Sequence, residues 1–566
     1  MKLLWSIIII LFSLNIKAQT NSEIESNTEE QIHLHINNTV FLPGEYLYYK
    51  LNLINPKNRK YSKIAYVQLI DSEKNIVSTQ KLIIEEGKAS GDIFIKENLL
   101  SGSYKLIAFT NLIKSKFQNE VYKQNLVILN PYSVDQNKIN IDPNASNKLL
   151  DSIKTDPDNQ WAVSTNKSKY TKRELIILTV KTRNNSVDSI ANVSISIRKK
   201  NKIPAPERKT IKELKNQTKT SLVNLNSKNS IAELKGEVFS GKINLKPTKK
   251  PVKNKLISVS LAGNPFQFKQ VKTNNLGEFK FTIPYRYEAS EIIIQPLEYL
   301  NQEITINLDP KENIDLSSLV FEDYTLSKNH LKPLVERSLR NQIENAYFKF
   351  KKDSINILSQ YSYFNESEKE FYELDDYKRF KTFKETCFEF IKPIVIRKNK
   401  NKKHSIFVKT KTGKILDLAS SPLILLNGTY VEDLEKLIQY DTRKVKRISI
   451  YKEPYVFGKQ RYQGVILIST FDPTEKILSD RSQSRSFSII KPEANKKYYK
   501  QIHNDQTKRL PDERHQLFWS PNIELNSSKK DIQFYSSDVL GTYWVEIEGF
   551  SKLGKPISLT TSFEVN

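Results

Sequence analysis

Histidines are the residues of this chain that most readily supply metal-ligand chemistry, and six are present: His33, His35, His330, His404, His503 and His515. A zinc protease of the zincin type needs two histidines one helical turn apart with a glutamate between them, and a metallocarboxypeptidase needs a His-x-x-Glu pair. Neither spacing occurs. His33 and His35 lie two residues apart in an expected strand, so they share one face, but no third ligand is near. We therefore expect no metal site.

The possible nucleophile Cys387 and the acid pair Asp375 and Asp376 do not indicate a catalytic site either. Cys387 is the single cysteine, so an intramolecular disulfide and a thiolate cluster are excluded. It lies among phenylalanines in an expected helix, which indicates a buried apolar thiol. Asp375 and Asp376 are adjacent, and adjacent side chains of an extended chain point to opposite sides. No Gly-x-Ser-x-Gly elbow, phosphate loop or dinucleotide fingerprint occurs, so we expect no enzyme, no catalytic residues and no cofactor.

Positive charge dominates the composition, with a formal net charge of +26. Eight basic residues gather between Arg397 and Lys414 on an expected hairpin. Such a run is either a solvated turn or a surface that docks on lipopolysaccharide phosphates, an acidic glycan or an acidic protein. We expect no nucleic-acid partner, because the chain also carries an export signal.

That export signal is the first eighteen residues, where Lys2 precedes an apolar run from Leu3 to Leu14 and Ala18 marks the expected cleavage site. The run is shorter than the roughly 20 residues that a membrane-spanning helix needs. No cysteine lies near Ala18 for lipidation. We therefore expect an exported protein of the periplasm or outer membrane, or of the cell surface, with a net charge of about +24 after removal of Lys2 and Lys17.

Alternating apolar and polar residues predict a mostly β fold of tandem Ig-like β-sandwiches with one α+β domain. A length of 566 residues suggests about three to five domains. Between Gln31 and Asn130, seven short strands such as YLYYKLNLI and IAYVQLID are separated by turn residues. This punctuation is typical of one β-sandwich.

The segment HLHINNTVFLPGEYLYYKLNLI, with IAYVQLID, IIEEGKASGDIFI and LLSGSYKLIAFTNLI after it, resembles the second macroglobulin domain of the alpha-2-macroglobulin superfamily. Lys169 to Asn184 repeats its alternation, with Tyr170 in the place of Phe41 and Glu174 in the place of Glu45. The C-terminal QLFWSPNIEL, DIQFYSSD and GTYWVEIEGF resemble macroglobulin strands again. The superfamily's protease traps use a Cys-Gly-Glu-Gln thioester, which KETCFEFIK does not provide, so we expect no thioester trapping.

Two further segments resemble modules of outer-membrane receptors. Residues 231–312 resemble a carboxypeptidase regulatory-like sandwich, and Asn274 to Gly277 predicts a hairpin between two of its strands. An amphipathic helix is expected at 326–350, with Leu331, Leu334, Val335, Leu339 and Ile343 on its apolar face, and a short one at 382–390. The order of PLILLNG, VEDLEKLIQY, VKRISIYK and GVILISTF then resembles the plug domain of TonB-dependent receptors, without the barrel that completes such a receptor.

The expected organisation is therefore a signal peptide at 1–18, a macroglobulin-like β-sandwich at 27–132, a second such sandwich with a basic linker at 155–230, a carboxypeptidase regulatory-like β-sandwich at 231–312, a plug-like α+β domain at 318–475 and a C-terminal macroglobulin-like β segment at 476–566.

This order of modules resembles a class of envelope proteins from Bacteroidota and implies a non-enzymatic binding or assembly protein with an outer-membrane protein as partner. The alternative is an accessory of a TonB-dependent uptake system that captures ligand or works as a plug with a separate barrel. Asp-Ser-Ile occurs at Asp151, Asp188 and Asp353, and resembles the acceptor for O-glycosylation in that phylum.

Overall fold

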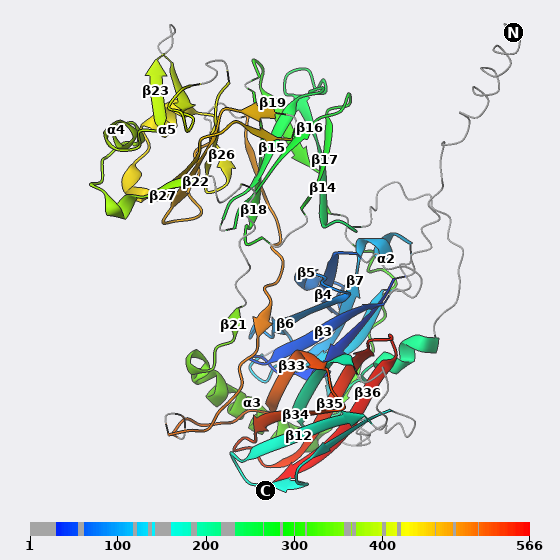
Figure 1. The fold of residues 1–566 in the computed structure, drawn as a ribbon. Helices are drawn as coiled ribbons and strands as arrows, with labels where there is room; N and C mark the ends of the chain where they lie inside the picture. Colours follow the sequence, from blue (N-terminus) through cyan, green and yellow to red (C-terminus); the bar gives the residue numbers. More distant parts are fainter. Residues whose placement is uncertain are drawn as a thin grey trace, which may run out of the picture.

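The structure, a computed structural model, describes residues 30–54, 62–116, 121–133, 139–141, 160–182, 190–216, 233–263, 265–283, 287–298, 300–311, 314–355, 364, 369–398, 403–415, 420–458, 460–478, 483–505, 507 and 509–566. The protein is mostly β, as predicted. Two sandwiches form the lower part of Figure 1, and two further units form the upper part. The expected signal peptide lies outside the described residues. Within the described ranges, no helix is long and apolar enough to cross a membrane.

The first sandwich has one sheet in the order β2-β8-β7-β4-β5 and a smaller one in the order β1-β3-β6. In β3, Leu47, Tyr49 and Leu51 alternate and are fully buried, because one face of the strand packs on the facing sheet. The strands are β1 (Gln31–Ile36), β2 (Val40–Phe41), β3 (Tyr46–Ile54), β4 (Ile64–Asp71), β5 (Ile76–Ile83), β6 (Lys88–Phe94), β7 (Gly102–Phe109) and β8 (Tyr122–Ile128).

The second sandwich is built from two distant parts of the chain. Strand β13 lies between β33 and β35, and β12 lies between β10 and β34. The sequence predicts separate modules at 155–230 and 476–566, whereas the structure joins their strands in common sheets around one core. Neither part supplies enough strands to bury its apolar face alone. The strands are β10 (Trp161–Thr165), β11 (Lys169–Tyr170), β12 (Leu175–Thr182), β13 (Ala191–Lys199), β33 (Gln516–Leu525), β34 (Lys529–Tyr535), β35 (Gly541–Ser551) and β36 (Pro556–Val565).

Gly549 allows β35 to approach β13 closely. A Cβ atom at this position would lie 2.2 Å from the backbone oxygen of Asn192. We expect Gly549→Ala to lower the free energy of unfolding by about 1–3 kcal/mol, because backbone atoms must move apart to admit the methyl group. Urea unfolding followed by tryptophan fluorescence would measure the change. Thr542→Ala, at an exposed position of the same strand, is the control, and an equal effect of both substitutions would contradict the prediction.

The third unit has the sheets β17-β14-β19 and β16-β15-β18-β31. The predicted hairpin at Asn274 to Gly277 is wrong, because β16 and β17 belong to different sheets. The turn itself forms, with Gly277 at a φ of 74°, but it carries the chain from one sheet to the other. The same turn residues can connect two strands of one sheet or strands of two sheets, so the sequence does not distinguish these connections. The strands are β14 (Glu237–Leu245), β15 (Leu256–Leu261), β16 (Gln267–Lys272), β17 (Glu278–Ile283), β18 (Glu291–Pro296), β19 (Ile304–Leu308) and β31 (Arg485–Ser488).

The fourth unit packs two short helices on a sheet of order β22-β27-β30-β25-β26. Helix α4 (Phe383–Glu389) confirms the short helix predicted there, and Thr382 and Glu385 form its capping box. The order of strand, Asn-Gly turn, helix and two strands is also as predicted. The remaining elements are β22 (Lys369–Glu373), β23 (Ile394–Lys398), β24 (His404–Val408), β25 (Leu423–Leu426), β26 (Thr429–Tyr430), α5 (Leu434–Ile438), η8 (Thr442–Lys444), β27 (Val445–Tyr451), β28 (Tyr455–Phe457), β29 (Gln460–Tyr462) and β30 (Val465–Thr470).

Helix α3 (Leu331–Ala346) lies beside the two sandwiches in the lower part of Figure 1, and its orientation differs from the prediction. Leu334 is buried as predicted. Val335 and Leu339, expected on the same apolar face, are 60% and 57% exposed, whereas Arg337 is buried. The reason is electrostatic: the Arg337 guanidinium forms an ion pair with Glu45 of the first sandwich, which turns the polar side of the helix inward.

Short elements complete the described chain. Residues 200–216, predicted as a linker, contact the first sandwich, where the Thr39 hydroxyl donates to the carbonyl of Pro206 at 2.8 Å. The remaining elements are α2 (Asn111–Lys116), β9 (Ile139–Ile141), η3 (Ile211–Asn216), β20 (Tyr324–Leu326), η4 (Lys328–His330), η5 (Phe348–Phe350), β21 (Ser354–Ile355), η7 (Leu374–Asp376) and β32 (Lys496–Lys497).

Candidate functional site

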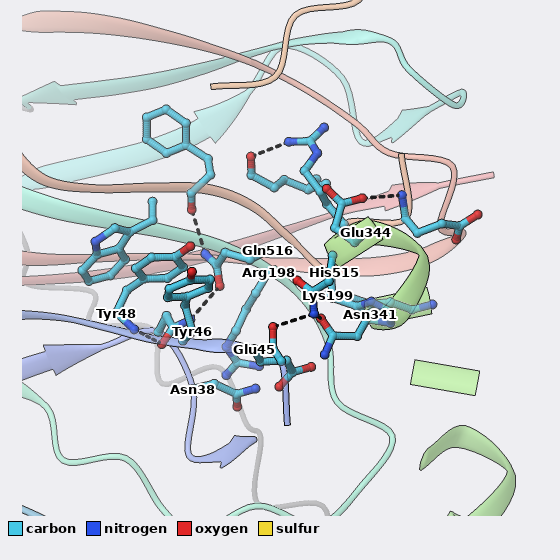
Figure 2. Close-up of a pocket in the computed structure, with 18 of the residues that line it drawn as sticks. Asn38, Glu45, Tyr46, Tyr48, Arg198, Lys199, Asn341, Glu344, His515 and Gln516 are labelled. Atoms are coloured by element: carbon cyan, nitrogen blue, oxygen red, sulfur yellow. Dashed lines mark hydrogen bonds between the residues drawn. The ribbon is translucent and has the colours of Figure 1, made fainter. Parts of the chain in front are cut away.

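A cavity of about 180 Å³ lies where the two sandwiches meet helix α3 (Figure 2). Its walls come from the loop before β3 and the start of β3, from the end of β13 and the start of β33, and from α3 with the residues that follow it. These segments are separated by more than a hundred residues in the chain. The cavity therefore exists only when both sandwiches are folded and docked.

A row of near-parallel aromatic rings lines one side of the cavity. Tyr46 stacks on Phe348 with a centroid distance of 6.1 Å and on Tyr48 with 5.7 Å. Tyr48 stacks in turn on Trp519, at 5.8 Å. The row links η5, β3 and β33, because alternate residues of β3 face away from its own sandwich core. Aromatic pairs of this kind add about 0.5–1.5 kcal/mol each beyond buried area.

Charged pairs form the other side. The Arg337 guanidinium donates from Nε and Nη2 to the two oxygens of Glu45, both at 2.7 Å, and from Nη1 to the side-chain oxygen of Asn201 at 3.1 Å. A bidentate ion pair of this type fixes the orientation of both side chains in addition to compensating their charges. Arg337 thus joins α3, the first sandwich and the residues after β13 at a single point.

A second ion pair closes the wall near the end of α3. The Lys351 ammonium lies 2.5 Å from Glu344, and the other Glu344 oxygen accepts the backbone N–H of Glu513 at 3.1 Å. Burial raises the pKa of Glu344 above its ordinary value, and Lys351 opposes this shift. Glu344 therefore ties α3 to the segment before β33.

Lys199 differs from the other cations of the cavity, because no acid of the described chain lies within ion-pair distance of its ammonium. Burial lowers its pKa to about 8, with Arg340 and Lys202 adding to the shift. Glu513, an acid of the cavity wall, pairs with Arg340. Lys199 adjoins His515 in Figure 2; burial, Arg337 and Lys199 hold the pKa of His515 well below its ordinary value, so its ring is neutral near pH 7.

His33 and His35, the pair considered as a metal site, lie in the contact between the sandwiches. His33 Nε2 lies 2.6 Å from a Glu548 oxygen, and His35 Nδ1 lies 2.6 Å from the Ser194 hydroxyl. Both side chains point to the same face, as the spacing predicts. Within the described ranges, no three His, Cys, Asp or Glu side chains are grouped to hold a metal ion.

We expect this contact to weaken in acid. Burial lowers the pKa of His35 well below 6.5; burial also opposes ionisation of Glu548, but Arg208 and His33 outweigh it and hold the Glu548 pKa at about 2. The unfolded chain then binds protons that the folded chain does not, starting below pH 6.5 for His35 and below 4.5 for Glu548. The free energy of unfolding should fall from pH 7 to pH 4 in urea titrations. A flat profile over that range would contradict the prediction.

Other residues considered from the sequence lie away from the cavity. Cys387 is buried in α4, and burial raises the pKa of its thiol far above the ordinary value. Asp375 pairs with Arg379 at 2.5 Å on the surface. The described part of the basic run lies on β23, β24 and the turn that follows, where His404 pairs with Glu435. These placements give neither a catalytic pair nor a reactive thiol.

Only one of the three Asp-Ser-Ile motifs lies within the described residues. Asp151 and Asp188 lie outside the described residues. Asp353 lines the cavity and accepts the backbone N–H of Tyr499 at 2.7 Å, while Ser354 is exposed on β21. Asp353 was not expected at a cavity, and its neighbour Ser354 is exposed.

Sequence reasoning singled out no binding residue and missed the cavity. The one local signal is the pair of tyrosines at alternate positions of β3, which places both rings on the face opposite Leu47. The residues that complete the walls, such as Arg337 and Trp519, sit in segments whose contacts depend on how the sandwiches dock. No periodicity along the chain reports that docking.

No protein-family model matches this chain. No curated protein matches it either. Among solved structures, the chain is similar to Escherichia coli alpha-2-macroglobulin activated by trypsin, with 8% identity, 95% of this chain and 23% of that one covered, and a TM-score of 0.16. The elastase-activated form is 8% identical, with 95% of this chain and 44% of that one covered and a TM-score of 0.24. The native conformation is 9% identical, with 95% of this chain and 22% of that one covered and a TM-score of 0.16. The chain thus spans less than half the length of these proteins.

Proposed function

We propose that this chain is a non-enzymatic binding and assembly protein of the cell envelope, exported by its first eighteen residues. The observation that carries the proposal is the cavity at the junction of the sandwiches. Glu45, Arg337 and Glu344 are engaged in bonds that join the cavity walls, so they shape the site rather than serve as acids or bases. A preformed, partly aromatic hollow with a few polar groups is typical of ligand binding.

The fourth unit is the part that we propose docks on an outer-membrane protein. Phe388 on α4 is 79% exposed and Phe371 on β22 is 55% exposed. β22 is also a terminal strand of its sheet among the described strands, so it offers backbone groups to a partner strand. Exposed aromatic rings and a sheet edge are two features through which proteins recognise partners.

A second candidate is an accessory of a TonB-dependent uptake system, in which the sandwiches capture a ligand and the fourth unit works with a separate barrel. The cavity is compatible with this candidate as well, because ligand capture also needs a binding site. The two candidates differ in the identity of the partner. A barrel receptor supports uptake, and any other envelope protein supports assembly.

The test is photocrosslinking in intact cells. A photoreactive phenylalanine analogue at position 388 should yield a crosslink to an outer-membrane protein, which mass spectrometry identifies. The matched control is the same analogue at Leu553, which is 62% exposed on the second sandwich. The proposal fails if position 388 gives no adduct with an envelope protein, or if both positions give the same adducts.

A further inference from the structure

The cavity is small, and its size limits the ligand. A volume of about 180 Å³ lies below the range of roughly 300–1,000 Å³ found for drug-sized ligands. A single six-membered ring with its substituents suits this space, whereas a folded peptide segment does not. The ligand is therefore one ring-sized unit, either free or at the end of a chain.

Charge on the Lys199 side of the cavity favours an anion, whereas the acid Asp353 lies toward Tyr48. The guanidinium of Arg337 and the ammonium of Lys351 are neutralised by partners at 2.7 and 2.5 Å, and Arg514 is paired with Asp512. Lys199 keeps an ammonium without an acid partner in the described chain. A ligand carboxylate placed at Lys199 would supply that partner through a charge-assisted hydrogen bond.

Polar atoms elsewhere on the wall favour a hydroxylated ring. Trp519 Nε1 is buried and has no hydrogen-bond partner among the described residues. Tyr46, Tyr48 and Asn38 also line the cavity with polar side chains. Such groups match sugar hydroxyls, which donate and accept together. An aromatic acid would fill the same space but leave these groups desolvated and unbonded, which is costly.

We propose that this cavity binds a uronate unit of an acidic glycan, with the carboxylate at Lys199 and the ring hydroxyls at the tyrosines and Asn38. The aromatic row then offers its ring edges to the apolar C–H groups of the sugar. The proposal rests on the binding role proposed above and names its ligand class. It is tested on the purified mature chain, so its failure leaves the crosslinking result independent.

The experiment is calorimetric titration with methyl glucuronide, and with methyl glucoside as the matched sugar without a carboxylate. We expect methyl glucuronide to bind at least about 10-fold more tightly, because a charge-assisted bond is lost with the carboxylate. Phenylacetate, which has a carboxylate on an aromatic ring, should bind more weakly than the uronide. Equal binding of either comparison compound, or no binding of the uronide, would overturn the proposal.

Two variants assign the binding to this cavity. Lys199→Gln should weaken uronide binding about 10-fold or more, and Tyr48→Phe, which keeps the ring and removes the hydroxyl, should weaken it several-fold. Lys202→Gln is the control, since Lys202 is an exposed lysine three residues away. Thermal unfolding of each variant reports whether it folds. Unchanged affinity in folded Lys199→Gln would place the uronide elsewhere and end the proposal.

Discussion

Glu548→Ala should lower the free energy of unfolding by about 3–5 kcal/mol, the usual cost of removing one partner from a buried charge pair. Glu548 is fully buried at the contact of the sandwiches, 2.6 Å from His33 of the first sandwich and 3.3 Å from Arg208. The substitution leaves the buried His33 and the largely buried Arg208 with less charge compensation. Urea unfolding at pH 7 would measure the loss.

Glu564→Ala is the matched control for Glu548. Glu564 belongs to the same sandwich and pairs with Lys169 at 3.3 Å, but both side chains are exposed. Exposed pairs contribute about 0–1 kcal/mol, so this variant should unfold close to the unchanged protein. If both glutamate variants unfold alike, the buried network does not stabilise the contact. The Glu548 variant should also lose part of the acid sensitivity below pH 4.5.

Lys81→Met should separate the lower and upper parts of the molecule, again at a cost of about 3–5 kcal/mol in their contact. Lys81 of β5 is 3% exposed and contacts Glu237 Oε1 at 2.7 Å and the Tyr287 hydroxyl at 2.8 Å, both in the third unit. It also donates to the carbonyl of Ile490 in the returning chain. Without the ammonium, the buried Glu237 carboxylate keeps Lys311 as its nearest cation, at 3.4 Å.

Limited proteolysis and small-angle scattering would detect the separation as faster cleavage between the parts and a larger radius of gyration. Lys255→Met is the control, because Lys255 forms an exposed pair with Glu298 at 3.6 Å. The double variant Lys81→Met with Glu237→Met should recover much of the loss, since apolar replacement of a whole buried pair is often neutral. Identical behaviour of Lys81→Met and Lys255→Met would contradict the prediction.

Local features of the fold could be predicted because they depend on neighbours in the chain. Leu47, Tyr49 and Leu51 alternate, which indicates one buried face of a strand, and they are buried. The short helix predicted at 382–390 forms as α4, where Thr382 and Glu385 cap it. In both cases the interacting groups lie within one turn or one strand of each other.

The cavity could not be predicted, because its walls depend on contacts over hundreds of residues. Nothing in the sequence around Arg337 indicates that it pairs with Glu45, which lies almost three hundred positions earlier. The apolar residues Val335 and Leu339 indicated the wrong inward face of α3. Hydrophobic periodicity selects the face that meets an apolar core, but α3 meets a polar junction, where ion pairs decide the orientation.

The sequence by itself determined the mostly β class, the strand faces and the short helix at 382–390, since these follow from side-chain periodicity and from contacts between near neighbours. Tertiary structure decided which strands share a sheet. β13 is hydrogen-bonded to β33 and β35, more than three hundred residues away, although two separate modules were expected. Backbone hydrogen bonds are the same for every residue, so strand pairing is chosen by the packing of whole faces, and with it the position of the cavity.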